Sequence, residues 1–208
     1  MEHNIQKRCL NILDYGCGVG TIDFYLASNG HKVLGLDISN TAIDSCRLSA
    51  MAMGLNKSAK FEITGRKLND KYDLILCSEV IEHVPGDVSL IKRLSKRLKK
   101  GGKLLISTPS ENAPLFKLGL ASNFDKRVGH VRRYNQEKLV KLIDETGLKI
   151  TKIKLVEGIL RNSLFVFPTF GVIVKFLKGP LSDLTETIDS ILVKLFGESN
   201  IFVIIKKP

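Results

Sequence analysis

The stretch Leu13–Gly20, with the sequence LDYGCGVG, constrains this chain most, because it places an acid and three glycines between an apolar run and a helical pattern. Leu10–Leu13 has the character of a buried strand, and the residues after Gly20 carry apolar side chains at spacings that suit a helix packed on a sheet. Glycine permits positive φ and close approach to the backbone, so a ligand can reach main-chain N–H groups where the helix begins. The stretch predicts a nucleotide-like ligand at this turn.

The spacing of the glycines separates two kinds of ligand. Dinucleotide-binding folds use G-x-G-x-x-G, whereas here Asp14 begins the order D-x-G-x-G-x-G, which argues against NAD. An acid at the strand end suits a ligand with a cationic amino-acid portion better than a pyrophosphate. Downstream, Val33–Asp37 has the pattern of a second buried strand that ends in a carboxylate, at about the distance where nucleotide-binding α/β folds bind ribose hydroxyls. We predict that Asp37 binds the ribose.

With these residues in place, the chain resembles the class I S-adenosylmethionine-dependent methyltransferases over about its first 150 residues. Within that class it resembles the ubiquinone-pathway O-methyltransferase and methyltransferase type 11 group. The matching pieces stand in the expected order, namely LDYGCGVG, GLDIS, YDLILCSEVIEHV, LKKGGKLLISTP and GHVRRYNQEKLVKLIDETGLKI. The combination is far more specific than any one of these motifs.

The resemblance implies S-adenosylmethionine as the cofactor and assigns residues to its parts. Asp14 and the three glycines hold the methionine portion, Asp37 holds the ribose, and Ile38 is the apolar neighbour of the adenine. The family usually has an Asp after its third strand that reads the adenine amino group; here Arg66, backbone groups or packing take that role. The implied cofactor site comprises Asp14, Gly16, Cys17, Gly18, Gly20, Asp37, Ile38, Arg66 and Ser78.

Strands alternate with helical patterns from residue 10 to about 155, which predicts a doubly wound α/β fold with a mostly parallel sheet and helices on both faces. The resemblance implies a seven-stranded, Rossmann-like sheet whose last strand runs antiparallel beside the fifth. With 208 residues, we expect one domain. The expected strands are Asn11–Tyr15, Lys32–Asp37, Lys60–Ile63, Tyr72–Ser78, Lys103–Ser107, Lys149–Val156 and Ile201–Lys206, and the expected helices are Thr21–Ser28, Thr41–Met53, Val88–Leu98 and Gln136–Thr146.

Two segments interrupt this alternation. Pro109–Tyr134 predicts a loop or lid after the fifth strand, where ligands of open α/β sheets bind. Gly158–Asn200 is an apolar insertion too interrupted to span a membrane. One hypothesis for its apolar piece Phe165–Phe176 is that it lines a substrate pocket or dips into a membrane face. Its helical stripe, most simply a helix lying on the sheet, comprises Ile188, Ile191, Leu192 and Leu195.

The net charge of +11 is concentrated on one expected helix and its exit. This basic edge is either a solvated helix face or a surface for phosphates, as in RNA or an anionic membrane, although no aromatics interleave with it. Four cysteines without a C-x-x-C pair indicate reduced thiols, and the N-terminus lacks a signal-peptide pattern, so we expect a cytoplasmic protein, with peripheral contact to the inner membrane face as an option. The basic residues are Lys92, Arg93, Lys96, Arg97, Lys99, Lys100 and Lys103.

Glu79, Glu82 and His83 are the candidates for acceptor chemistry. Their spacing of i, i+3 and i+4 predicts one face of a helical turn after the fourth strand. A sulfonium methyl is already activated, so its transfer needs positioning, but a hydroxyl acceptor must also lose its proton to a base or beside a metal. Two carboxylates and an imidazole can bind Mg²⁺, Mn²⁺ or Zn²⁺, or His83 can act alone as the base. Alternatively, Glu79 touches the cofactor while the other two cap the turn.

The E-x-x-E-H pattern also resembles ubiquinone-pathway O-methyltransferases and small-RNA 2′-O-methyltransferases, and this implies a divalent metal that activates the acceptor hydroxyl. In the small-RNA enzymes a further histidine completes the site, and His130 is the candidate here. The chain has no Asn-Pro-Pro-Tyr or Asp-Pro-Pro-Tyr motif after the fourth strand, which favours oxygen as the acceptor. We therefore expect methyl transfer to a small or lipid-like acceptor. The alternatives are an RNA methyltransferase that uses the basic edge with Arg132 and Arg133, and a non-catalytic cofactor-binding partner subunit.

Overall fold

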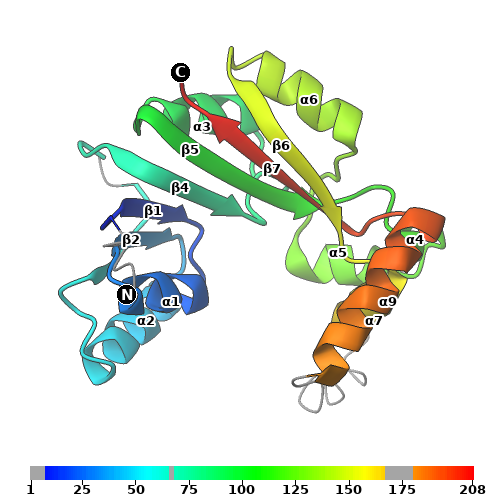
Figure 1. The fold of residues 1–208 in the computed structure, drawn as a ribbon, viewed down its shortest axis with the longest axis horizontal. Helices are drawn as coiled ribbons and strands as arrows, with labels where there is room; N and C mark the ends of the chain where they lie inside the picture. The colour runs from blue at the N-terminus through cyan, green and yellow to red at the C-terminus, as the bar shows by residue number, and fades with distance from the viewer. Residues whose placement is uncertain (1–7, 66–67, 167–179) are drawn as a thin grey trace, which may run out of the picture. The chain divides into compact units, whose positions relative to one another are not determined.

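The computed structural model describes residues 8–65, 68–166 and 180–208, and within these ranges seven strands form one sheet in the order β3-β2-β1-β4-β5-β7-β6 (Figure 1). The strands are β1 (Asn11–Tyr15), β2 (Lys32–Asp37), β3 (Ala59–Ile63), β4 (Tyr72–Ser78), β5 (Leu98–Pro109), β6 (Lys149–Val156) and β7 (Asn200–Lys206). The helices are α1 (Thr21–Ser28), α2 (Asn40–Ala52), α3 (Asp87–Ser95), α4 (Pro114–Lys117), α5 (Ser122–Val128), α6 (Gln136–Asp144), α7 (Ile159–Val166) and α9 (Pro180–Phe196).

The predicted fold class is confirmed, since a mostly parallel seven-stranded sheet alternates with helices along the chain. The expected bounds of β1, β2, β4, β6 and α1 are those observed, and β7 lies beside β5 in the sheet. The bounds of β5 differ: it begins at Leu98 instead of Lys103. A Cβ on Gly102 would meet the carbonyl oxygens of Lys99, Tyr72 and Asp73 at 3.0–3.2 Å, so this glycine allows the backbone of β5 to approach the start of β4.

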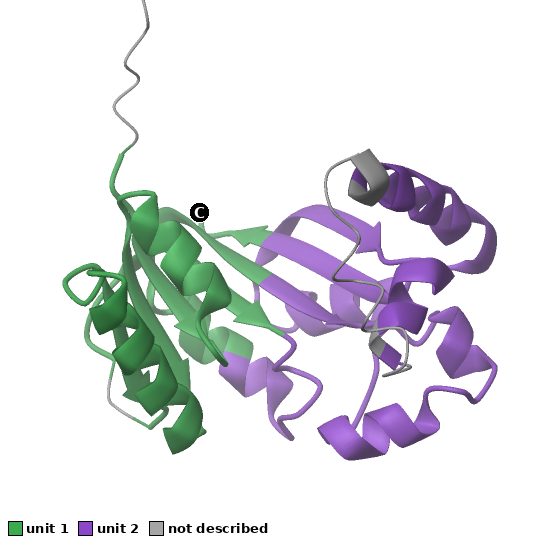
Figure 2. Ribbon diagram, turned by 90° about the horizontal axis from the view of Figure 1, so that it is seen from below, with its two compact units in different colours: residues 1–78, 91–105, 205–208 green, residues 79–90, 106–204 purple. Residues whose placement is uncertain are grey.

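The chain divides into two compact units (Figure 2). Unit 1 comprises residues 1–78, 91–105 and 205–208, and unit 2 comprises residues 79–90 and 106–204. The expected cofactor site belongs to unit 1, whereas the expected acceptor chemistry belongs to unit 2. Each unit is therefore described by itself.

In unit 1, β1 pairs in parallel with both β2 and β4, and β2 pairs in parallel with β3. The apolar residues of these strands meet α1 and α2 in a core that contains Ile12, Val33, Ile43 and Phe61. The Ser39 side chain caps α2 by accepting a hydrogen bond from the Ala42 N–H. The carboxyl ends of β1 and β2 are thereby fixed at one edge of the sheet.

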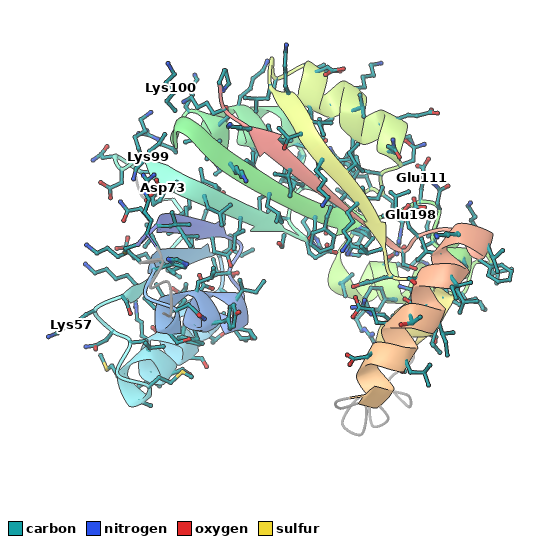
Figure 3. The ribbon with its side chains drawn as sticks, in the orientation of Figure 1. Lys57, Asp73, Lys99, Lys100, Glu111 and Glu198 are labelled. Atoms are coloured by element: carbon teal, nitrogen blue, oxygen red, sulfur yellow. The ribbon has the colours of Figure 1, made fainter. Side chains whose placement is uncertain are left out.

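In unit 2, the segment after β5 is held at both of its ends. The buried Glu198 carboxylate, labelled in Figure 3, accepts hydrogen bonds from Ser110 Oγ (2.7 Å) and Asn112 Nδ2 (3.0 Å). A parallel bridge joins Ser110 to Tyr134, and between them lie α4 and α5. Asn135 caps α6 by accepting a hydrogen bond from the Lys138 N–H. The role of Pro109–Tyr134 as a lid stays a prediction.

The helix α9 packs against α7 (Figure 1), and its buried side includes one acid, Asp189. The buried Asp189 accepts hydrogen bonds from the N–H groups of Gly158 (2.8 Å) and Arg161 (3.1 Å), at the start of α7. The expected burial of the stripe on α9 is wrong for three of its four residues, because Ile188, Ile191 and Leu195 are 43%, 54% and 68% exposed, whereas Leu192 is half-buried. The position of Asp189 turns the three exposed residues outward. The apolar piece Phe165–Phe176 lies largely outside the described residues.

None of the helices that the described residues form is both long and apolar enough to cross a membrane.

We predict that Asp189→Ala destabilises the protein by about 1–2 kcal/mol, because the first turn of α7 loses its cap and two N–H groups lose their acceptor. Thermal unfolding should show a decrease of about 2–4 °C for each kcal/mol. Asp183→Ala, at an exposed acid of α9, should change stability by less than about 0.5 kcal/mol. Equal losses for the two variants would contradict this role of Asp189.

Candidate functional site

The glycine turn after β1 leaves the start of α1 open. Gly16, Gly18 and Gly20 have φ angles of 89°, 53° and 75°, in the left-handed region. The N–H groups of Gly16 and Cys17 both donate to the Leu36 carbonyl, which ties the turn to β2. Gly20 precedes α1, and no side chain caps the helix there. The first N–H groups of α1 therefore remain available to an anionic or polar ligand group.

Asp37 lies directly against this turn. Its Oδ2 accepts a hydrogen bond from the Gly18 N–H, and its Oδ1 accepts one from the Ser39 N–H, each at 2.9 Å. The neighbouring Ile38 is 84% exposed, so its apolar surface is accessible beside Asp37. The structure thus brings together the acid, the glycines and the apolar residue that the sequence assigned to ribose, methionine portion and adenine.

Behind the turn lies a pair of buried carboxyl groups, of which the sequence revealed only one. Asp14 is 5% exposed, and Asp23, on α1, is 0% exposed. Burial is the largest cause that raises the pKa of each, and the charge of Asp14 raises the pKa of Asp23 further. Asp23 stands four residues before the buried Ala27 on the inward face of α1. A charged residue at the helical spacing of a buried apolar residue is the sequence signal that could have identified Asp23.

The remaining residues of the implied cofactor site give less evidence about how a cofactor would be bound. Cys17 and Cys46 are buried thiols whose pKa is raised by burial and by nearby acids, so they stay protonated. All four cysteines are free, as predicted. Ser78 is the last residue of β4, half-buried. Arg66 lies outside the described residues.

In unit 2, the helical turn expected over Glu79–His83 is wrong. Glu79 has a φ of 53°, which breaks the regular conformation directly after β4, and a tight turn follows in which the His83 N–H donates to the Val80 carbonyl. Glu79 instead accepts hydrogen bonds from Ser107 Oγ (2.8 Å) and Asn200 Nδ2 (2.9 Å). The i, i+3, i+4 spacing consequently does not gather the three side chains.

A different trio forms a compact cluster, which consists of Glu82, His83 and His130. One potential ligand atom from each lies within 4.8 Å of the other two. Glu82 is 0% exposed; its Oε2 accepts from Thr108 Oγ1 at 3.1 Å, whereas its Oε1 has no hydrogen-bond partner among the described residues. Burial, and then the charge of Glu79, raises the pKa of Glu82. An unpartnered buried carboxylate oxygen beside two imidazoles fits a bound cation.

Both imidazoles of the cluster have their Nδ1 atom engaged. His83 Nδ1 lies 3.0 Å from the Gly129 carbonyl, and His130 Nδ1 lies 2.8 Å from Asp125 Oδ1. Both partners are acceptors, so each Nδ1 carries a hydrogen and each ring is left with Nε2 for other contacts. Burial lowers the pKa of His130, which keeps it neutral near pH 7. Metal-binding histidines typically have this arrangement.

The two arginines after His130 are both paired with acids, and one of them supports the cluster through Asp125. Arg133 donates to both oxygens of Asp125 and lies with its guanidinium 4.6 Å from the Phe116 ring centroid. Arg132 donates to Asp87 Oδ2 at 2.8 Å. Both arginines therefore form ion pairs within unit 2. The partners are Asp87 and Asp125, neither of which the sequence had suggested.

Part of the basic edge is also engaged within unit 1. Arg93 donates to the Tyr15 hydroxyl and lies over the Tyr15 ring, 5.6 Å from its centroid. Lys99 pairs with Asp73 at 2.7 Å, and Figure 3 shows these two side chains beside each other. These contacts indicate that Arg93 and Lys99 of the basic edge stabilise the fold and are less available to bind phosphates.

Known proteins identify the family. Residues 3–153 match the sequence profile of a family described as a methyltransferase domain. The chain belongs to this methyltransferase domain family. Among its relatives, the ubiquinone biosynthesis O-methyltransferase of Leptothrix cholodnii is 32% identical over 115 residues, which cover 53% of this chain and 49% of that protein. Its counterpart in Idiomarina loihiensis is 27% identical over 166 residues, 78% of this chain and 68% of that protein. The chain thus spans about half to two thirds of these relatives.

Solved structures agree on the fold of this methyltransferase domain. An S-adenosylmethionine-dependent methyltransferase of Methanosarcina mazei has a TM-score of 0.63 at 21% identity, with 99% of this chain and 95% of that one covered. Magnesium protoporphyrin IX methyltransferase of Synechocystis, solved with bound S-adenosylhomocysteine, has a TM-score of 0.65 at 16% identity, with 96% and 75% covered. The predicted class I methyltransferase fold is confirmed.

We predict that Gly20→Ala lowers stability more than Gly18→Ala. Both positions have positive φ, which costs a residue with a Cβ about 1–2 kcal/mol. Only at Gly20 would the methyl group also meet side chains, at 3.0 Å from Cys46 Sγ and 3.1 Å from Phe61 Cε1, which adds about 1–3 kcal/mol. Chemical denaturation measures both, and equal losses would contradict the open space found at Gly18.

Proposed function

We propose that this protein is an S-adenosylmethionine-dependent methyltransferase that acts on a hydroxyl oxygen. The hydrogen bond between Asp37 and Gly18 carries the proposal, because it puts a ribose-binding carboxylate on the glycine turn. The turn offers N–H groups to the amino-acid portion of the cofactor, and the exposed Ile38 offers an apolar surface to the adenine. The NAD alternative lacks a pyrophosphate site of the expected spacing.

Methyl transfer requires the acceptor oxygen to attack the sulfonium methyl carbon. The new C–O bond forms as the C–S bond breaks, and the cofactor leaves as a neutral thioether. The hydroxyl proton must leave the acceptor, and an Nε2 lone pair of His83 or His130 can receive it. Because burial lowers the pKa of His130, this imidazole is available as a base at neutral pH.

The Glu82–His83–His130 cluster also suits a divalent metal. Glu82 Oε1 and the two Nε2 atoms would hold it, and Asp125 would orient His130 from behind. A bound metal would lower the pKa of the acceptor hydroxyl. Two nitrogens and one carboxylate are a ligand set typical of Zn²⁺ or Mn²⁺ more than of Mg²⁺, which prefers oxygen.

The acceptor that we propose is small or lipid-like. The relatives named for ubiquinone biosynthesis support this, as does the exposed apolar side of α9 with Leu184, Ile188, Ile191 and Leu195. That side of α9 can contact an apolar molecule or a membrane surface. An RNA acceptor has less support, because Arg132 and Arg133 are paired with acids and part of the basic edge is engaged. A non-catalytic subunit would have no use for the cluster of Glu82, His83 and His130.

We predict that the protein binds S-adenosylmethionine and S-adenosylhomocysteine in calorimetric titrations and does not bind NAD. Asp37→Ala should weaken binding at least about tenfold, since hydrogen bonds from the ribose to a charged acceptor are lost. Asp44→Ala, at an exposed acid of α2, should leave the affinity unchanged. Binding of NAD without binding of the sulfonium cofactor would contradict the proposal.

A second prediction concerns the metal. Titration with Mn²⁺ or Zn²⁺ should show one site that is lost in Glu82→Gln and weakened about 10–100-fold in Asp125→Asn, because the latter only orients His130. Glu79→Gln should bind the metal like the wild type, because Glu79 lies outside the cluster. If Glu82→Gln retains full affinity, the cluster is not a metal site.

A further inference from the structure

The buried carboxyl pair behind the glycine turn has no use in the methyl transfer described above. No N–H or O–H group of another described residue reaches Asp14 Oδ1 or either oxygen of Asp23. Each carboxyl group influences the pKa of the other, so the two are close neighbours. Two buried carboxylates can only accept hydrogen bonds and repel each other, so one of the two must carry a proton. The pair therefore holds one proton and one negative charge.

Among the described residues of unit 1, no positively charged side chain is paired with Asp14 or Asp23. The titratable groups that face the pair are Asp37 at the end of β2, Cys17 in the turn and Cys46 on α2, all of which are neutral or negative. Two buried like charges without a cation are strongly unfavourable, so the proton stays until a cation arrives.

We propose that Asp14 and Asp23 release their shared proton when a ligand ammonium binds at the glycine turn, so that Asp23 is a positioning residue for the charged end of the cofactor. The inference rests on the proposed function and on the family resemblance, which assigns Asp14 to the methionine portion of S-adenosylmethionine. The ammonium then supplies the positive charge that the proton supplied before. Asp23 acts through Asp14 because it lies deeper, with no exposed surface.

Because ligand binding is linked to proton release, the exchange predicts the direction in which ligand affinity changes with pH. The free protein holds a proton that the complex has lost, so affinity rises with pH over the range in which the free pair is protonated. For one released proton, the dissociation constant falls by up to about tenfold per pH unit. Burial raises the pKa of both carboxyl groups above their ordinary value near 4. The pH interval in which affinity depends on pH therefore extends from about 4 towards neutral pH.

The experiment is calorimetry at pH 7 in buffers of different ionisation enthalpy, with S-adenosylhomocysteine and 5′-methylthioadenosine as probes. The first carries the ammonium and the second lacks it, while both carry the adenosine. We expect S-adenosylhomocysteine to release about one proton and methylthioadenosine to release none. Proton release that is equal for both probes, or absent for both while they bind, would overturn the inference and leave the proposed function intact. If neither probe binds, the proposed function fails and takes the inference with it.

Variants separate the pair from other groups. Asp23→Asn should bind S-adenosylhomocysteine with little proton release and a flat pH dependence, whereas Asp44→Asn, at an exposed acid of α2, should behave like the wild type. Proton release that persists in Asp23→Asn would overturn the inference. Infrared difference spectra of the wild type give a second measurement, because the band of a protonated carboxyl group should disappear when S-adenosylhomocysteine binds. An unchanged band would count against the exchange, even if Asp23→Asn does not fold.

Discussion

A buried carboxyl group must acquire a proton, hydrogen-bond donors or a cation, and this requirement organises both units of the protein. Asp189 satisfies it with two N–H groups at the start of α7, and the half-buried Asp125 satisfies it with Arg133 and His130. These acids hold elements in place. Asp23 and Glu82 are fully buried but have oxygens without donors among the described residues. The satisfied acids are structural, and the unsatisfied ones lie where we expect ligands.

The sequence predicted the elements of unit 1 closely because their signals are local. A short apolar strand, a glycine turn and a helix stripe follow one another within about 20 residues, and each limits the bounds of the next. The pairing of Asp37 with the turn followed from the parallel order of β1 and β2, whose carboxyl ends share an edge. Asp23 was missed because an acid in a helix is normally expected at the surface. Only its position beside the buried Asp14, which the structure shows, indicates otherwise.

The acceptor cluster was predicted only in part, for a different reason. The spacing of Glu79, Glu82 and His83 indicates a shared face only if the backbone is helical, and the positive φ of a non-glycine residue is not readable from sequence. His130 enters the cluster from a segment far along the chain, through Asp125 and the Gly129 carbonyl. The outward stripe of α9 likewise depends on bonds from Asp189 to residues about 30 positions earlier. Periodicity identifies a helix but not which side another helix covers.

The requirement that a buried charge needs a partner also applies to the charges that change during the proposed reaction. Transfer of the methyl group removes the positive charge of the sulfonium, while the acceptor proton places a new positive charge on an imidazole. At His130 that charge would form 2.8 Å from the Asp125 carboxylate, which already fixes the ring through its Nδ1 hydrogen. Asp125 keeps its negative charge because Arg133 and His130 lower its pKa against the opposing effect of burial. One carboxylate can therefore orient the neutral base and stabilise its protonated form, which would explain why the arginine behind it faces inward and not the acceptor.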